Sequence, residues 1–148
     1  MCRDTEGVKR MDKLEYIPGD LVMVKKSALQ FAKDKIFKVI SSLSGGFVKV
    51  VMLNDSSTTY SISNNAVRPI PLTPEILEKN GWNKEMYHDW RHYLPIERTL
   101  LYLSGGVNRD GAFEVCVGID MSYVASISFV HQLQHLLFSL GLNSEMEV

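Results

Sequence analysis

Between residues 17 and 70, short apolar runs alternate with polar turns at a spacing typical of small antiparallel β-sheets. Five strands are predicted, at residues 21–24, 36–40, 47–53, 58–63 and 67–70. Gly45 and Gly46 join the second strand to the third, so these two strands should form a hairpin. Pro69 has no backbone N–H to donate, which places the last strand at an edge of the sheet.

Five short strands in about 55 residues, opening with Gly19, Asp20 and an apolar run, resemble the SH3-like barrels. In that family a bent five-stranded sheet closes on itself, and the resemblance implies the same arrangement for residues 15–71. An OB-like barrel or an open, curved sheet would produce the same pattern of strands. The sequence therefore predicts an SH3-like small β-barrel or a curved sheet.

A short helix is predicted directly after this sheet. Thr73 stands at its N-cap and Pro74 at its first helical position, while Leu72 can pack against Leu77 as a hydrophobic staple. Asn80-Gly81 ends the helix. A second helix is predicted over residues 83–93, because Tyr87, Trp90 and Leu94 recur at helical spacing before Pro95.

Beyond Pro95 the period of the apolar residues returns to two. Residues 100–103 and 113–119 are predicted as a hairpin around the glycine-containing loop 105–111, and residues 123–127 as a third strand. A terminal helix over residues 129–140 follows. It is predicted to have Ser128 as its N-cap, Gly141 as its C-cap, and an apolar stripe of Leu133, Leu136, Leu137 and Leu140.

These elements predict an α+β fold in three parts. Residues 1–14 have almost no apolar content and are expected to form a disordered tail. Residues 15–71 form the barrel or curved sheet. Residues 72–148 form a helix followed by a β-meander that the C-terminal helix covers, because that helix must bury its apolar stripe against a sheet.

The two halves differ in charge, although the whole chain has a formal net charge of -1. Residues 1–70 carry 11 Lys and Arg against 7 Asp and Glu, and residues 71–148 carry 5 against 10. An anionic partner should therefore meet the first half. Cys2 and Cys116 make no disulfide framework, and no apolar stretch is long enough for a signal peptide or membrane span, so we expect a cytoplasmic protein.

Two segments of the second half resemble a group of small uncharacterised bacterial proteins associated with prophages and other mobile elements. They are residues 72–82, Leu-Thr-Pro-Glu-Ile-Leu-Glu-Lys-Asn-Gly-Trp, and residues 129–134, Phe-Val-His-Gln-Leu-Gln. The two segments occur in the same order, near the middle and the end of the chain. The resemblance implies a phage or mobile-element origin, and it carries no catalytic residue.

All four histidines fall in two His-x-x-x-His pairs, His88 with His92 and His131 with His135. On a helix this spacing places both imidazoles on one face, where they can chelate zinc and, with Glu85 or Asp89 as further ligands, polarise a water molecule. Neither pair has the glutamate of a His-Glu-x-x-His protease. The alternative, which we favour, is that no cofactor binds and that His131 and His135 flank the apolar stripe as half-buried polar residues.

Six lysines lie along the first strands and their connection: Lys25, Lys26, Lys33, Lys35, Lys38 and Lys49. Such a cluster can contact phosphates without reading bases, and Phe31, Phe47 and Tyr60 could offer surfaces on which bases stack. The alternative is a solvated rim of lysines with these aromatic residues in the core.

Three functions follow from these observations. The first is a non-catalytic binding or adaptor protein of phage or mobile-element origin, which binds a protein or a nucleic acid through the barrel and no membrane. The second is a metal-binding protein or a metal-dependent hydrolase that uses the histidine pairs. The third is an inhibitor of a host defence system. The sequence specifies neither the partner nor the oligomeric state.

Overall fold

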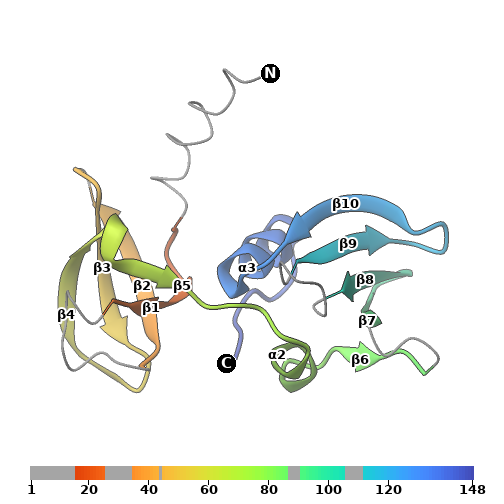
Figure 1. Cartoon of the computed structure of the whole chain (residues 1–148), viewed down its shortest axis with the longest axis horizontal. Coiled ribbons are helices and arrows are strands. Elements are labelled where there is room, and N and C mark those ends of the chain that lie inside the picture. The colour runs from red at the N-terminus through yellow and green to blue at the C-terminus, as the bar shows by residue number, and fades with distance from the viewer. Residues whose placement is uncertain (1–15, 26–34, 44, 87–90, 106–111) are drawn as a thin grey trace. The chain divides into compact units, whose positions relative to one another are not determined.

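The chain forms two compact units, Met1–Ile70 and Pro71–Val148, each built on a five-stranded antiparallel sheet. The structure is a computed structural model and describes residues 16–25, 35–43, 45–86, 91–105 and 112–148. Figure 1 shows the first sheet as β1 to β5 and the second as β6 to β10. The predicted tail, residues 1–14, lies outside the described residues.

The first unit contains the five strands that the apolar pattern predicts. They are β1 (Leu21–Val24), β2 (Phe37–Leu43), β3 (Phe47–Met52), β4 (Asp55–Ser63) and β5 (Val67–Pro69), with a 3-10 turn at Asn64–Ala66. Their order in the sheet is β4-β3-β2-β1-β5. Gly45 and Gly46 join β2 to β3 with φ values of 82° and 84°, which suit glycine, so the predicted hairpin is confirmed.

One face of the first sheet forms the core of the unit. Every strand contributes to this face, with Val22 and Val24 from β1, and Phe37, Val39, Val48, Val50, Ile62 and Val67 from the other strands. The ladder shifts register between Val39 and Ser41 and again between Val51 and Met52. Bulges of this kind increase bend and twist, which lets a small sheet curve around its own core.

The predicted closed SH3-like barrel is not found. The edge strands β4 and β5 stand at opposite ends of the sheet, and within the described residues no pairing joins them. β5 has only three residues and ends at Pro69, so it offers few backbone donors for a second neighbour. The first unit is therefore an open, curved sheet, with Pro69 in an edge strand as predicted.

The second unit places five strands between two helices. In chain order its elements are α2 (Pro74–Lys79), β6 (Asn83–Lys84), β7 (Arg91–Ile96), β8 (Thr99–Gly105), β9 (Phe113–Val117), β10 (Ser122–Ile127) and α3 (Val130–Ser139). The strands follow one another across the sheet in the order β10-β9-β8-β7-β6. The predicted hairpin of β8 with β9 and the third strand β10 are both confirmed.

Helix α2 begins and ends as its sequence predicts. The Thr73 hydroxyl accepts a hydrogen bond from Ile76 N (3.2 Å), and Pro74 occupies the first helical position. The chain leaves the helix through Gly81, whose φ of 89° favours glycine. Leu72 and Leu77 are both buried, so the short helix is anchored on its apolar side.

The predicted helix over residues 83–93 is wrong. Asn83–Lys84 and Arg91–Ile96 are the strands β6 and β7, and they pair with each other. β7 also pairs with β8 along its whole length, from Arg91 opposite Ser104 to Ile96 opposite Thr99. The helix prediction rested on the spacing of only three apolar residues, and the pairing of β7 with β8 decides the structure instead. Two of these three residues, Tyr87 and Trp90, lie outside the described residues.

Helix α3 follows β10 and has one buried side, but its N-cap differs from the prediction. Gln132, and not Ser128, supplies the capping oxygen: its Oε1 accepts from Ser128 N (2.7 Å) and Phe129 N (3.1 Å). Of the predicted stripe, Leu133 and Leu137 are buried, whereas Leu136 is half-buried and Leu140 is exposed.

Candidate functional site

The face of the first sheet opposite its core, called the outer face below, carries the basic residues of the strands. Lys38 in β2 lies opposite Val51 in β3, and Lys49 stands two residues before Val51. Directly opposed residues in an antiparallel pair point to the same side, and so do alternate residues along a strand. Lys38 and Lys49 therefore share the outer face.

Strands β1 and β5 extend this basic surface. Leu21 in β1 lies opposite Lys38, and Met23 lies opposite Arg68 of β5, so Arg68 shares the outer face. Lys25 follows Met23 by two residues and is held at the end of β1 by its N–H, which donates to Ala66 O (2.8 Å). Arg68 was missed by the sequence prediction because it stands far along the chain, between Val67 and Pro69, and only strand pairing brings it close.

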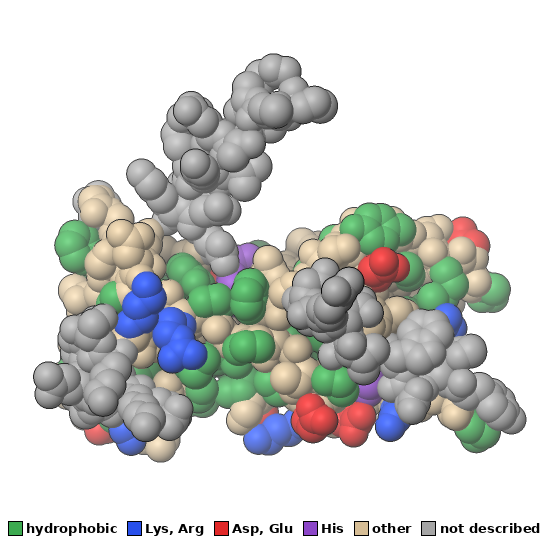
Figure 2. Space-filling model, in the orientation of Figure 1, with side chains coloured by type: hydrophobic (Ala, Val, Ile, Leu, Met, Phe, Trp, Pro, Cys, Tyr) green, Lys and Arg blue, Asp and Glu red, His purple; other side chains and the backbone are tan. Residues whose placement is uncertain are grey.

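The described strands place no carboxylate on the outer face. Asp20 is buried and accepts a hydrogen bond from Ile17 N (2.9 Å) within its own turn. Asp55, at the start of β4 beyond a register shift, is exposed and accepts hydrogen bonds from the N–H and the hydroxyl of Ser57. Figure 2 shows basic side chains side by side on the first unit, whereas acidic and basic side chains both occur on the second unit. The outer face therefore concentrates the charge excess of the first half.

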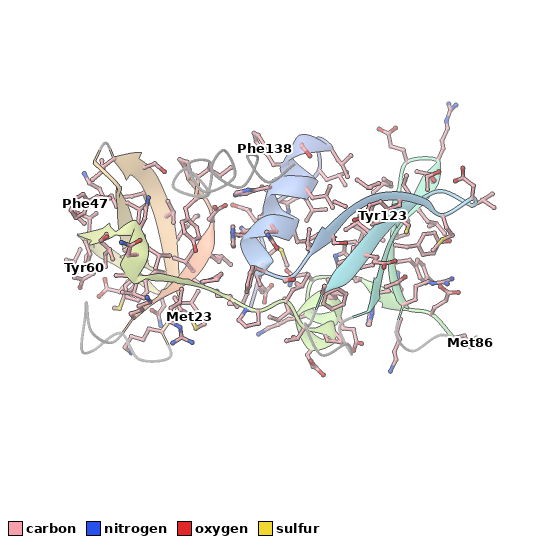
Figure 3. The ribbon with its side chains drawn as sticks, turned by 45° about the horizontal axis from the view of Figure 1, so that its top comes forward. Met23, Phe47, Tyr60, Met86, Tyr123 and Phe138 are labelled. Atoms are coloured by element: carbon pink, nitrogen blue, oxygen red, sulfur yellow. The ribbon has the colours of Figure 1, made fainter. Side chains whose placement is uncertain are left out.

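Two of the predicted stacking residues have different environments. Phe47 is 46% exposed at the end of the outer face, next to Lys49 in the alternation of β3. Tyr60 instead packs against the core, with its ring edge-on to Phe37 at 6.2 Å. Figure 3 shows Phe47 and Met23 at opposite ends of the sheet. Phe47 thus remains a candidate for stacking, whereas Tyr60 is a structural residue and Phe31 lies outside the described residues.

Of the other predicted lysines, Lys35 is exposed just before β2, and Lys26 and Lys33 lie outside the described residues. Lys35 and Lys25 flank the end of the sheet where β1 leaves it. The structure therefore brings Lys25, Lys38 and Lys49 to one face together with Arg68.

His92 is buried in β7 and is tied to helix α2. Its side chain is 1% exposed, and its Nε2 lies 2.8 Å from Glu78 Oε2, so the imidazole N–H donates to the carboxylate. This hydrogen bond lowers the pKa of Glu78 below its usual value, although partial burial opposes the shift. His92 therefore joins strand to helix, and its predicted partner His88 lies outside the described residues.

His131 and His135 lie on helix α3 as the sequence predicts, but their environments differ. His131 is fully buried with its ring stacked on Phe129 at 6.0 Å, while His135 is half-buried with its ring edge-on to His131 at 5.5 Å. Among the described residues, no group of three or more His, Cys, Asp or Glu is placed to hold a metal ion. The aromatic stacking of His131 favours the packing role expected for this pair.

Comparisons with known proteins give no family for this chain. No protein-family model, no curated protein and no solved structure matches it. Within the described residues, no helix has the length and apolar content needed to cross a membrane. The surfaces of the two units are therefore the basis for the function proposed below.

Proposed function

We propose that the chain is a non-catalytic binding protein whose first unit binds nucleic acid through the outer face of its sheet. The observation that carries the proposal is the shared face of Lys25, Lys38, Lys49 and Arg68, where the described strands place no carboxylate. Uncompensated cations on a sheet attract phosphates and give salt-dependent affinity. A phage or mobile-element origin is part of this proposal and is supported by the resemblance at residues 72–82 and 129–134.

The geometry of β3 favours a backbone contact beside a stacked base. Lys49 and Phe47 are alternate residues on one face, so their Cα atoms lie about 6.6 Å apart along an extended strand. A lysine at this distance can reach a phosphate while the exposed Phe47 ring supports a base. Lysine contacts to phosphates carry no sequence information, so we expect binding with little base preference.

The proposal is tested by fluorescence anisotropy with labelled single-stranded and duplex DNA and RNA of about 20 nucleotides. Lys38→Glu combined with Lys49→Glu should weaken binding roughly tenfold or more and make the dependence of log affinity on log salt shallower by about 1.4 to 1.8. The matched control, Lys84→Glu with Arg98→Glu, makes the same change of charge on the second unit and should leave affinity unchanged.

Phe47→Ala separates the two kinds of contact. It should weaken binding of single strands more than binding of duplexes while leaving the salt dependence unchanged, because it removes stacking and no charge. Binding that does not respond to salt, or an equal loss in both charge-reversal variants, would contradict the proposal.

A further inference from the structure

The second sheet has one buried face and one face that is only partly buried. Residues of the opposite, buried face include His92, Leu103 and Val115, which are aligned across β7, β8 and β9. The alternate residues Tyr93 of β7 and Tyr102 of β8 are aligned on the other face and are only partly buried. This face, called the tyrosine face below, continues through Cys116 to Tyr123 of β10, which is 62% exposed.

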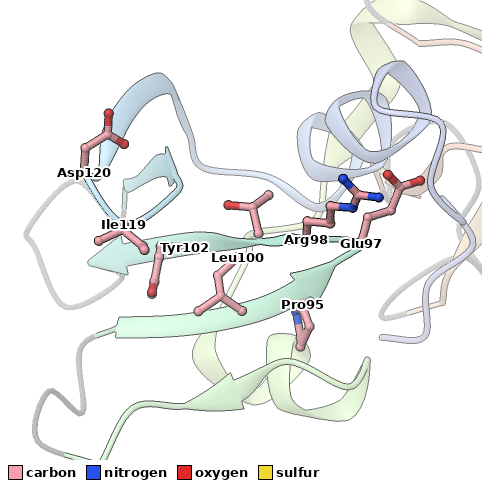
Figure 4. Close-up of a pocket in the computed structure, with 8 residues that line it drawn as sticks. Pro95, Glu97, Arg98, Leu100, Tyr102, Ile119 and Asp120 are labelled. Carbon is pink, nitrogen blue, oxygen red and sulfur yellow. The ribbon is translucent and has the colours of Figure 1, made fainter.

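A shallow pocket of about 740 Å³ opens at one end of the tyrosine face. Pro95, Leu100 and Tyr102 line it, and Figure 4 shows these three side chains pointing to the same side of the ribbon. Ile119, from the turn between β9 and β10, stands beside Tyr102 and is fully exposed. This volume is within the range of pockets that hold a small ligand or a short stretch of peptide.

Two strained turns bound this pocket. Among the described residues, the only non-glycine residues in the left-handed region are Glu97 (φ 46°) and Met121 (φ 55°). Glu97 lies in the turn between β7 and β8, and Met121 lies in the turn between β9 and β10. Backbone strain of this kind gathers at ligand sites, where it fixes the position of the residues around it.

The rings of Tyr93 and Tyr102 form the middle of the face. Their centroids lie 6.4 Å apart with an angle of 50° between the ring planes. The Arg91 guanidinium lies 5.8 Å from the centroid of Tyr102 and pairs with Glu85 at 3.3 Å. The positive charge at this end is thus offset by a carboxylate.

Around the rest of the face, acidic residues outnumber basic ones: Glu97 and Asp120 line the pocket together with Arg98. Glu114 stands two residues before Cys116 on the same side of β9, and burial, followed by the charge of Glu114, raises the pKa of the Cys116 thiol. Residues 71–148 carry 10 Asp and Glu against 5 Lys and Arg. This balance disfavours nucleic acid at the tyrosine face and favours a basic ligand.

We propose that the tyrosine face binds a proline-rich segment of a partner protein, in the polyproline II conformation and flanked by Lys or Arg. A polyproline II helix rises about 3.1 Å per residue, so two residues span about 6.2 Å, close to the separation of the two tyrosine rings. Its backbone has no internal hydrogen bonds, and tyrosine hydroxyls can donate to its carbonyls. The pocket then receives an apolar residue of the segment.

This inference concerns the second unit and stands independently of nucleic-acid binding by the first. The test is a selection from a phage-displayed library of random peptides of about twelve residues, with the full chain as bait. We expect enrichment of proline-rich sequences that carry Lys or Arg. An enriched peptide, synthesised with a fluorescent label, is then titrated with the wild type and its variants.

Ile119→Ser should weaken binding of that peptide roughly tenfold, and Tyr102→Ala should weaken it further, because each removes an apolar contact at the face. The side chain of Ile119 is fully exposed, so its replacement opens no cavity. Ile119→Ser therefore still tests the proposal if Tyr102→Ala does not fold. Phe138→Ser is the matched control: Phe138 is 69% exposed on helix α3, and its loss should not change the affinity.

Several outcomes would overturn the inference. They are enrichment of peptides without proline, enrichment of acidic peptides, absence of any enrichment, and equal affinity of the wild type and Ile119→Ser. A dimer in analytical ultracentrifugation that Ile119→Ser dissociates would also overturn it, because the face would then be occupied by a second copy of the chain.

Discussion

The two sheets of this protein have the same number of strands but bury their apolar faces in different ways. The first sheet curves around a core that all five of its strands supply, and two bulges accompany the curvature. The second unit instead contains helix α3, whose Leu133 and Leu137 are buried like the residues on one face of the sheet. Each sheet has a second face opposite its buried one, and these two faces differ in chemistry.

An antiparallel sheet with one buried face normally presents polar residues on the other. The outer face of the first sheet follows this rule in part: Lys38 and Lys49 lie there, but the neighbours of Lys38 across the strands, Leu21 and Val51, are apolar and buried. The tyrosine face departs from it, since Tyr93, Leu100 and Tyr102 are only partly buried there. An apolar patch on a free face marks an interaction surface. This difference is the reason why we propose an anionic ligand for the first unit and an apolar, basic ligand for the second.

The largest expected effect tests whether the two cores are separate. Phe37 in the first core and Phe113 in the second are both fully buried, so Phe37→Ala and Phe113→Ala should each lower the free energy of unfolding by about 3–5 kcal/mol. Denaturant titration measures the loss, and amide hydrogen exchange shows where it acts. We expect Phe37→Ala to reduce protection in β1 to β5 and Phe113→Ala to reduce it in β6 to β10.

Uniform loss of protection in both sheets after either substitution would contradict this separation. Phe138→Ala is the control, because the exposed Phe138 side chain contributes little to either core and should leave stability within about 0.5 kcal/mol of the wild type.

The first sheet could be predicted closely because its signals are local. The apolar run Leu21–Val24 predicts a strand, and Gly45-Gly46 predicts a turn, from a few adjacent residues in each case. Both are found where they are predicted. Closure of the barrel could not be predicted, since it depends on whether the distant strands β4 and β5 meet. The same limit applies to the candidate site, because Arg68 joins the lysines only through its pairing with Met23.

The second unit was predicted less well where tertiary contacts decide the structure. β7 pairs with β8, although the spacing of its apolar residues predicts the end of a helix. In this strand His92 lies next to Glu78 of α2. The tyrosine face was missed for the same reason. Tyr93 and Tyr102 are nine residues apart in the sequence, and only a strand assignment for residues 91–96 makes them neighbours.

A smaller effect is expected from glycines at the two hairpins. Gly46 in the first unit has a φ of 84°, and an added Cβ would meet no other atom. Gly46→Ala should therefore lower the free energy of unfolding by about 1–2 kcal/mol, because alanine disfavours the left-handed backbone. Gly105, at the end of β8, has a φ of 123°, and an added Cβ would lie 2.6 Å from Ala112 O. Gly105→Ala should therefore destabilise the protein more than Gly46→Ala in thermal or denaturant unfolding. An equal loss would show that β8 and β9 separate easily at this end.

The smallest effect concerns one carboxylate in each unit. Asp55 in the first unit has its pKa lowered by the Ser57 hydroxyl and then by the Ser57 N–H, whereas Glu78 in the second has its pKa lowered by the hydrogen bond from His92. A lowered folded pKa contributes stability above the unfolded pKa, and that stability is lost as the pH falls through the folded pKa. The fold should therefore lose stability below about pH 4.5 as Glu78 is protonated, and below about pH 3.8 as Asp55 is protonated.

The two carboxylates differ in how far their partners lie along the chain. Ser57 is two residues from Asp55, so their hydrogen bond can form in part in the unfolded chain, whereas Glu78 and His92 are 14 residues apart and meet only in the folded unit. Glu78→Gln should therefore remove more of the acid dependence of the unfolding free energy than Asp55→Asn does. Denaturant titrations from neutral pH to about pH 3 measure both slopes. A larger change for Asp55→Asn would mean that the turn of the first sheet, and not the contact between α2 and β7, governs acid stability.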